Sequence, residues 1–90
     1  MSGAKKMNVN YRIETLENGV KIGKIALEEL KNDRNAAVVY RRGAGDEFKN
    51  ATIGIENNEL NFWIANGLNQ YLIKNGNGET IYRIIININK

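Results

Sequence analysis

Hydrophobic and polar positions alternate along most of this chain, but one long segment follows a different spacing. Its apolar residues recur at steps of three and four, at Leu60, Trp63, Ile64, Gly67, Leu68, Tyr71 and Leu72. Such steps place side chains on one stripe of a helix. Asn57 or Asn58 can cap the start of this helix, and Asn75-Gly76 suits its end. The pattern therefore predicts one long helix within residues 57–74.

Two features of this predicted helix are unusual. Gly67 lies in its middle, where glycine costs about 1 kcal/mol relative to alanine, unless a close backbone approach compensates. The only charges between its ends are Glu59 and Lys74, although a surface helix normally carries a charged outer face. Either the C-terminal strand or another subunit covers a second side of the helix, or the outer face of the helix is polar because of its asparagines and carries no charge. We favour a homodimer with an interface at Phe62, Trp63, Gly67 and Ile73.

Alternation predicts strands before the helix. In residues 7–16, Met7, Val9, Tyr11 and Ile13 share one face, and Asn18-Gly19 then favours a hairpin turn because both residues accept positive φ. Residues 20–30 begin as a strand but change face. A kink or bulge near Gly23 would explain this change, and a short helix over 25–31 is the alternative.

Two further strands are predicted over residues 36–42 and 51–56, the second with Ala51, Ile53 and Ile55 towards the core. A last strand over 80–89 is too apolar for an exposed edge, so it needs either the N-terminal strand or another chain as a partner. The predicted order is β-β-β-β-α-β. This is an α+β fold, an antiparallel β-sheet with one long helix packed on one face.

Length and composition limit the possible chemistry. Ninety residues suit a single domain, which we place at 7–90 behind a flexible basic tail at 1–6. The chain has no cysteine and no histidine, which removes thiolate sites, the commonest general base and the commonest zinc ligand. Gly43 and Gly45 lie between two strands and open no helix, so they fit a hairpin loop rather than a nucleotide site. We therefore expect no enzyme, no catalytic residue, no metal and no cofactor.

The same features bear on location. No apolar run approaches the roughly 20 residues that span a bilayer, and the first residues lack the apolar segment of a signal peptide. The absence of cysteine fits an intracellular protein. We expect a cytoplasmic protein that has no membrane partner and no small-molecule substrate.

Basic and aromatic residues interleave before the predicted helix. The net charge is +3 and the pI about 9.3, which permits a nucleic-acid partner without requiring one. Single-stranded nucleic acid binds to basic surfaces that carry aromatic side chains for base stacking. Solvent-facing strand positions are also often basic, so the residues alone support binding and an ordinary surface about equally. The candidate binding residues are Lys24, Lys31, Arg34, Tyr40, Arg41, Arg42, Phe48 and Lys49.

From residue 20 to about 71 the chain resembles the positive-cofactor-four family of transcriptional coactivators, which bind single-stranded DNA and have a fold of the Whirly and Pur-alpha type. Ile22-Gly23-Lys24 is similar to a tripeptide at the start of the family's first strand, and Gly54-Ile55-Glu56 to its approach to the helix. The spacing of Leu60, Trp63 and Gly67 is similar to that of its helix. The chain departs from the family in lacking a proline before the helix and a tryptophan after Arg42, which puts base stacking in doubt.

The resemblance implies a four-stranded sheet with a helix on one face, a dimer packed through helices, and single-stranded DNA on the basic sheet faces. On that analogy Tyr40 or Phe48 stacks bases and the basic residues contact phosphates. We expect binding of single-stranded DNA, with RNA as the alternative, at low sequence specificity in transcription, replication or repair; a viral or plasmid genome is one setting. The main rival is a structural or protein-interaction module that assembles through its outer strands. A small hydrolase is a distant third.

Overall fold

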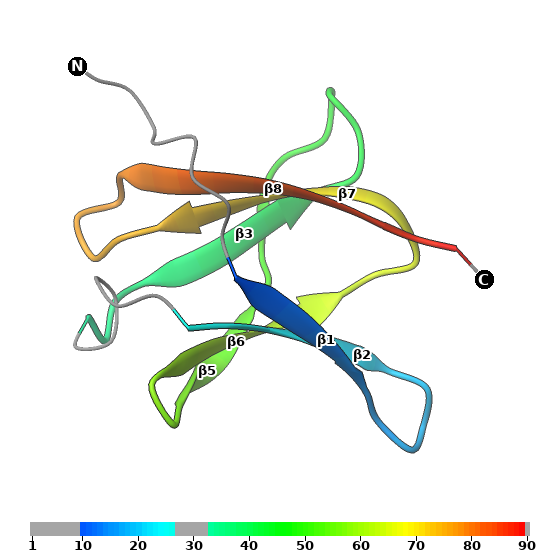
Figure 1. Cartoon of the computed structure of the whole chain (residues 1–90). Coiled ribbons are helices and arrows are strands. Elements are labelled where there is room, and N and C mark those ends of the chain that lie inside the picture. The colour runs from blue at the N-terminus through cyan, green and yellow to red at the C-terminus, as the bar shows by residue number, and fades with distance from the viewer. Residues whose placement is uncertain (1–9, 27–32, 90) are drawn as a thin grey trace.

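Eight strands form two four-stranded antiparallel sheets in the computed structural model, which describes residues 10–26 and 33–89 (Figure 1). The first sheet has the order β1 (Tyr11–Thr15), β2 (Lys21–Ile25), β6 (Glu59–Ile64) and β5 (Thr52–Glu56). The second sheet has the order β4 (Lys49–Asn50), β3 (Ala37–Arg41), β7 (Gly67–Lys74) and β8 (Thr80–Ile88). The described residues contain no helix, so the predicted α+β class is wrong and this part of the chain is all-β. It accordingly has no helix long and apolar enough to cross a membrane.

The predicted helix is replaced by β6 and β7, and its predicted N-cap is a hairpin turn. Asn57 and Asn58 have φ values of 53° and 63°, and Glu56 pairs directly with Glu59 across the turn. Two consecutive residues with positive φ are typical of the type I′ turn, whose twist matches that of the flanking strands. Asparagine tolerates this conformation better than most residues do. The two asparagines therefore end β5 and start β6.

A bend between β6 and β7 produced the apparent helical spacing. In β6 the inward side chains are at even positions, Leu60, Phe62 and Ile64, whereas in β7 the buried Tyr71 and Ile73 are at odd positions. Joining two alternating patterns that are out of phase gives steps of three and four. The predicted stripe is not one face, because its members Trp63 and Leu68 are 48% and 56% exposed.

The remaining elements follow the predictions with two corrections. The hairpin between β1 and β2 is confirmed, with Gly19 at a φ of 88°, as are strands within 36–42 and 80–89. β2 pairs with both neighbours without a shift of register, so Gly23 marks no bulge. Of the predicted inward residues of β5, only the flanking Ala51 is buried, because Ile53 and Ile55 lie on an edge strand with a register shift. Residues 27–31 of the alternative short helix lie outside the described residues, as do Met7 and Val9.

The core lies between the two sheets. Phe62 of the first sheet meets Tyr71 of the second with ring centroids 5.2 Å apart, and both side chains are fully buried. The chain passes between the sheets at Ala51, whose N–H donates to Val38 O at 2.7 Å and whose carbonyl accepts from Trp63 N at 2.8 Å. It passes again at the bend from β6 to β7. The buried Asn69 side chain closes this bend by donating to the carbonyls of Ala65 and Gly67.

Alkaline unfolding should depend on the buried Tyr71. Burial raises the pKa of its hydroxyl above the usual value near 10, although the Ala65 backbone and the Arg42 charge partly oppose this shift. The folded state therefore favours the neutral phenol. This stabilisation is complete below about pH 10 and is lost as the pH rises through the raised pKa. Urea unfolding between pH 8 and 11 should show a fall in the free energy of unfolding that is smaller in Tyr71→Phe.

The control for that measurement is Tyr11→Phe, because Tyr11 lies on edge strand β1 and is 41% exposed. Its free energy of unfolding should keep the pH dependence of the wild type. Equal pH dependence in both variants would show that burial of Tyr71 does not cause the alkaline transition.

Candidate nucleic-acid interface

Five of the predicted binding residues come together where β3 meets β4. The two strands form an antiparallel pair in which Tyr40 lies opposite Lys49, and a turn over residues 42–48 connects them. A hydrogen bond from Gly43 N to Asp46 Oδ2 at 3.1 Å, together with one from Asp46 N to Gly43 O, holds this turn. The short connection therefore places the ends of both strands side by side. We name these five residues the β3–β4 cluster: Tyr40, Arg41, Arg42, Phe48 and Lys49.

Arg41 and Phe48 form a cation–π pair whose aromatic ring is partly exposed. The Arg41 guanidinium lies 4.6 Å from the centroid of the Phe48 ring, a cation–π distance. The same guanidinium donates to Gln70 Oε1 at 3.2 Å and to Ala44 O at 3.1 Å, which fixes its plane. Phe48 is 37% exposed, which leaves part of its ring accessible. A planar base can stack on such a partly exposed ring.

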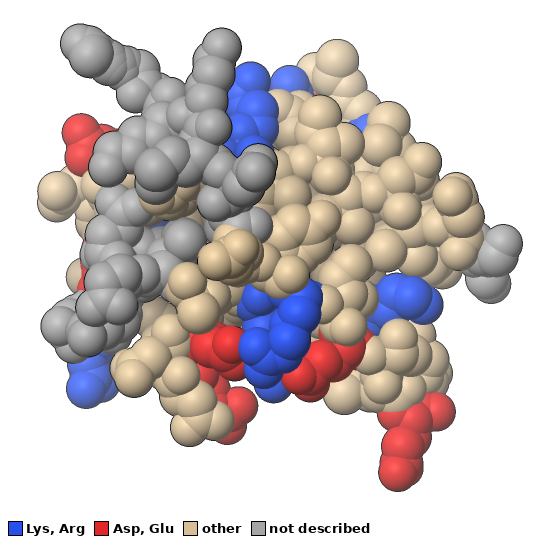
Figure 2. Space-filling model, in the orientation of Figure 1, with Lys and Arg blue, Asp and Glu red and all other residues tan. Residues whose placement is uncertain are grey.

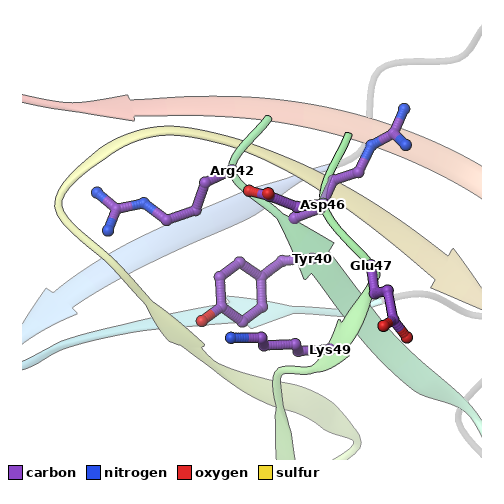
Figure 3. Close-up of a pocket in the computed structure, with 6 residues that line it drawn as sticks. Tyr40, Arg42, Asp46, Glu47 and Lys49 are labelled. Carbon is purple, nitrogen blue, oxygen red and sulfur yellow. The ribbon is translucent and has the colours of Figure 1, made fainter. Parts of the chain in front are cut away.

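The Tyr40 ring packs against the core. Its ring stacks on Tyr71, with centroids 5.8 Å apart and an angle of 26° between the planes. The Lys49 side chain runs beside the Tyr40 ring (Figure 3). Tyr40 therefore connects the β3–β4 cluster to the buried Tyr71, and Phe48 is the more accessible aromatic side chain of the cluster.

Four of the five cluster residues, all except Phe48, line a pocket of about 270 Å³. Small-molecule sites usually measure about 300–1,000 Å³, so this pocket suits one part of a longer ligand. Three cations and two carboxylates line it, which leaves an excess of one positive charge. Arg42 and Glu47 point in opposite directions, and the Asp46 carboxylate points toward the side of Arg42 (Figure 3). The lining residues are Tyr40, Arg41, Arg42, Asp46, Glu47 and Lys49.

Charges on the first sheet are arranged differently. Arg12 forms ion pairs with Glu59 and Glu14, and Lys24 Nζ lies 3.3 Å from Glu14 Oε1. Hydrogen bonds from Arg12 lower the pKa of both carboxyl groups, and Lys24 contributes at Glu14. Figure 2 shows blue and red atoms in contact over β1 and β2. These ion pairs all lie on the first sheet; among the described residues, the cations of the β3–β4 cluster form none.

The other predicted residues do not join the cluster. Lys24 lies in the ion-pair network of the first sheet, and Arg34 is exposed in the turn before β3, at the opposite end of that strand from Arg42. Lys31 lies outside the described residues. Residues that the sequence did not place beside the cluster are Asp46, Glu47 and Gln70. Asp46 and Glu47 lie in the turn between β3 and β4. The sequence predicted that turn, so their position beside the cluster could have been inferred from it.

The residues of the predicted dimer interface do not share a surface either. Phe62 and Ile73 are 0% exposed within the core of one chain, where they are not available to a partner. Trp63 is half-exposed on the first sheet, and Gly67 begins β7 with a φ of 92°. The helix on which this interface depended is absent from the described residues.

Comparisons with known proteins found no matching family model, no similar curated protein and no similar solved structure. Within the described residues, no group of three or more acidic side chains is arranged to hold a metal ion. The chemistry of the β3–β4 cluster is therefore the basis for a functional proposal.

Proposed function

We propose that this protein binds single-stranded nucleic acid with low sequence specificity through the β3–β4 cluster, in transcription, replication or repair. One observation carries the proposal. The cluster combines cations that form no ion pair among the described residues with an exposed aromatic ring that a guanidinium already orients. Basic groups that contact phosphates and flat groups that stack bases are the two parts of a sequence-tolerant single-strand site.

The geometry suggests which cluster residues contact a base and which contact phosphates. A base stacks on the exposed part of the Phe48 ring, which Arg41 orients, while Arg42 and Lys49 contact the flanking phosphates. Stacking contributes about 1–3 kcal/mol per base, whereas phosphate contacts position the strand and read little sequence. The small excess of positive charge limits the number of phosphates to about one to three. The logarithm of affinity should therefore fall with the logarithm of salt concentration with a slope of only about −0.7 to −2.

Fluorescence anisotropy with a labelled dT oligonucleotide of about 20 nucleotides, measured from low to physiological salt, tests this proposal. We expect Phe48→Leu to weaken binding about 5- to 100-fold, because leucine keeps apolar contact but offers no ring for stacking. Lys49→Gln should weaken binding and make the salt slope shallower by about 0.7, since one phosphate contact is lost. Circular dichroism should show that both variants remain folded.

Arg34→Gln is the matched control, because it removes one exposed positive charge at the opposite end of β3. Its affinity and salt slope should remain close to those of the wild type. Equal losses in Arg34→Gln and Lys49→Gln would indicate non-specific attraction by the whole molecule. Absence of binding at low salt would refute the proposal and leave a protein-interaction module as the better reading.

A further inference from the structure

We propose that the outer edge of β8 pairs in antiparallel fashion with β8 of a second copy of this chain, so that the second sheets of two copies become one continuous sheet. This inference goes beyond nucleic-acid binding and does not depend on it. It rests on the contrast between β8 and the other three edge strands, on the exposure of its apolar side chains, and on its self-complementary sequence.

Three of the four edge strands carry features that oppose pairing with another chain. β1 holds Arg12 and Glu14 in an ion-pair network. β5 has a register shift between Thr52 and Gly54, and β4 is only two residues long. Charges, irregular backbone and short length are the usual ways in which natural sheets protect an exposed edge.

β8 is protected in this way only at its start, where its pairing with β7 shifts register between Thr80 and Tyr82, and from Tyr82 to Ile88 it pairs regularly. It is nine residues long, five of them are isoleucine, and its one charge is Arg83. It pairs with β7 on one side, and no described strand pairs with its other side. In an antiparallel ladder alternate residues direct their N–H and C=O groups outward. Along Arg83 to Ile88 a second strand would pair with those groups, and an isolated apolar edge invites association.

The side chains of β8 point to the same conclusion. Ile84 and Ile86 face the core and are buried, while Ile85 on the opposite face is 65% exposed. Leu68 of β7, 56% exposed, shares this outer face. Where the C-terminal part of β8 crosses the molecule, the surface in Figure 2 is mainly tan. A partner strand at this edge would extend the buried layer and cover part of the exposed apolar layer.

The sequence of β8 matches itself in one two-fold register. With Ile85 opposite its own copy, Arg83 lies opposite Asn87 and Ile84 lies opposite Ile86. From Arg83 to Asn87 each polar residue then meets a polar residue and each isoleucine meets an isoleucine, while Ile88 lies opposite the apolar ring of Tyr82. Centring the pair on Arg83 would place like charges opposite each other, and centring it on Ile84 would place Arg83 opposite Ile85. Cross-strand pairs favour matched partners and disfavour like charges, so the register on Ile85 is preferred.

Sedimentation equilibrium of the full chain across a wide concentration range tests the edge pairing. We expect a reversible dimer, and at least a tenfold higher dimer dissociation constant for Ile85→Lys, because two lysines would then face each other across the two-fold axis. The exposed position should let this variant fold. Leu68→Lys is the control, since it adds the same charge to the same sheet face but on β7, away from the edge. Its dimer should persist.

Each alternative result is informative. A chain that stays monomeric at all concentrations, or a dimer that survives Ile85→Lys, would overturn the proposal. Equal dissociation by Leu68→Lys would assign the contact to the sheet face and overturn edge pairing. The register is tested separately by single cysteines, because the chain has none of its own. A short thiol crosslinker should join Ile85→Cys chains more efficiently than Arg83→Cys chains, and the reverse order would exclude the register on Ile85.

Discussion

Gly23→Ala is expected to lower the free energy of unfolding by about 3 kcal/mol, the upper end of the usual cost of overpacking a core. Gly23 lies in β2 directly beneath the Phe62 ring of β6, and an added Cβ would sit 2.2 Å from Phe62 Cζ and 2.6 Å from Cε1. The ring has little room to move, because it is fully buried and packed on Tyr71. Urea denaturation followed by circular dichroism measures this loss.

Gly54→Ala is the matched control for Gly23→Ala. Gly54 also lies in a strand of the first sheet, but nothing is within 4 Å of an added Cβ. We expect little change, or a gain of about 0.5–1 kcal/mol, because alanine loses less conformational freedom on folding. Adding Phe62→Leu to Gly23→Ala should cost less than the sum of the two single changes, since the clash would be relieved. Similar losses for Gly23→Ala and Gly54→Ala would show that the ring is not the cause.

Replacing both Asn57 and Asn58 with alanine is expected to destabilise the protein by about 2–4 kcal/mol. Each asparagine occupies the left-handed region of φ, which costs an ordinary L-residue about 1–2 kcal/mol. The turn joins β5 to β6, and β6 is a central strand of the first sheet. Thermal or urea unfolding of the double variant provides the measurement.

The comparison for this change is the double glycine variant, because glycine accepts positive φ without strain. It should keep the stability of the wild type to within about 1 kcal/mol, and it separates the backbone requirement from loss of the asparagine side chains. If both double variants lose the same stability, the turn conformation is not what these positions contribute.

The strands were predictable where one alternating pattern runs without interruption. Val38 in β3 and Ile84 in β8 lie on the buried faces that alternation indicates. The same reasoning failed between Glu59 and Lys74, because periodicity cannot show that the chain bends at Asn66 and that the alternation changes phase there. The composition of this segment already argued against a helix. A surface helix without a charged outer face is unusual, whereas neighbouring strands of a two-sheet fold do not require a charged face. The sequence allowed either a helix N-cap or a hairpin turn at Asn57 and Asn58. The positive φ of both residues in the structure shows that they form a turn.

The candidate site divides in a similar way. Arg41, Arg42, Phe48 and Lys49 belong to two paired strands and their connection, so their proximity follows from local sequence. Lys24 was grouped with them because it precedes the predicted helix, but the order of strands places it in the other sheet, beside Glu14. Strand order depends on contacts between distant segments, and a single sequence shows no such contacts. The ion pair that neutralises Lys24 was hidden for the same reason.

The central positions of β6 and β7 also affect how fast the protein folds. The two strands follow each other in the chain, yet each lies in the middle of a different sheet. Their pairs with β5 and β8 are hairpins, which form in about 1–10 μs, but their pairs with β2 and β3 must close long loops. Loop closure costs entropy before these distant contacts stabilise the chain, so folding should take milliseconds to seconds. The early species would include the β5–β6 and β7–β8 hairpins, and the second of these already carries β8.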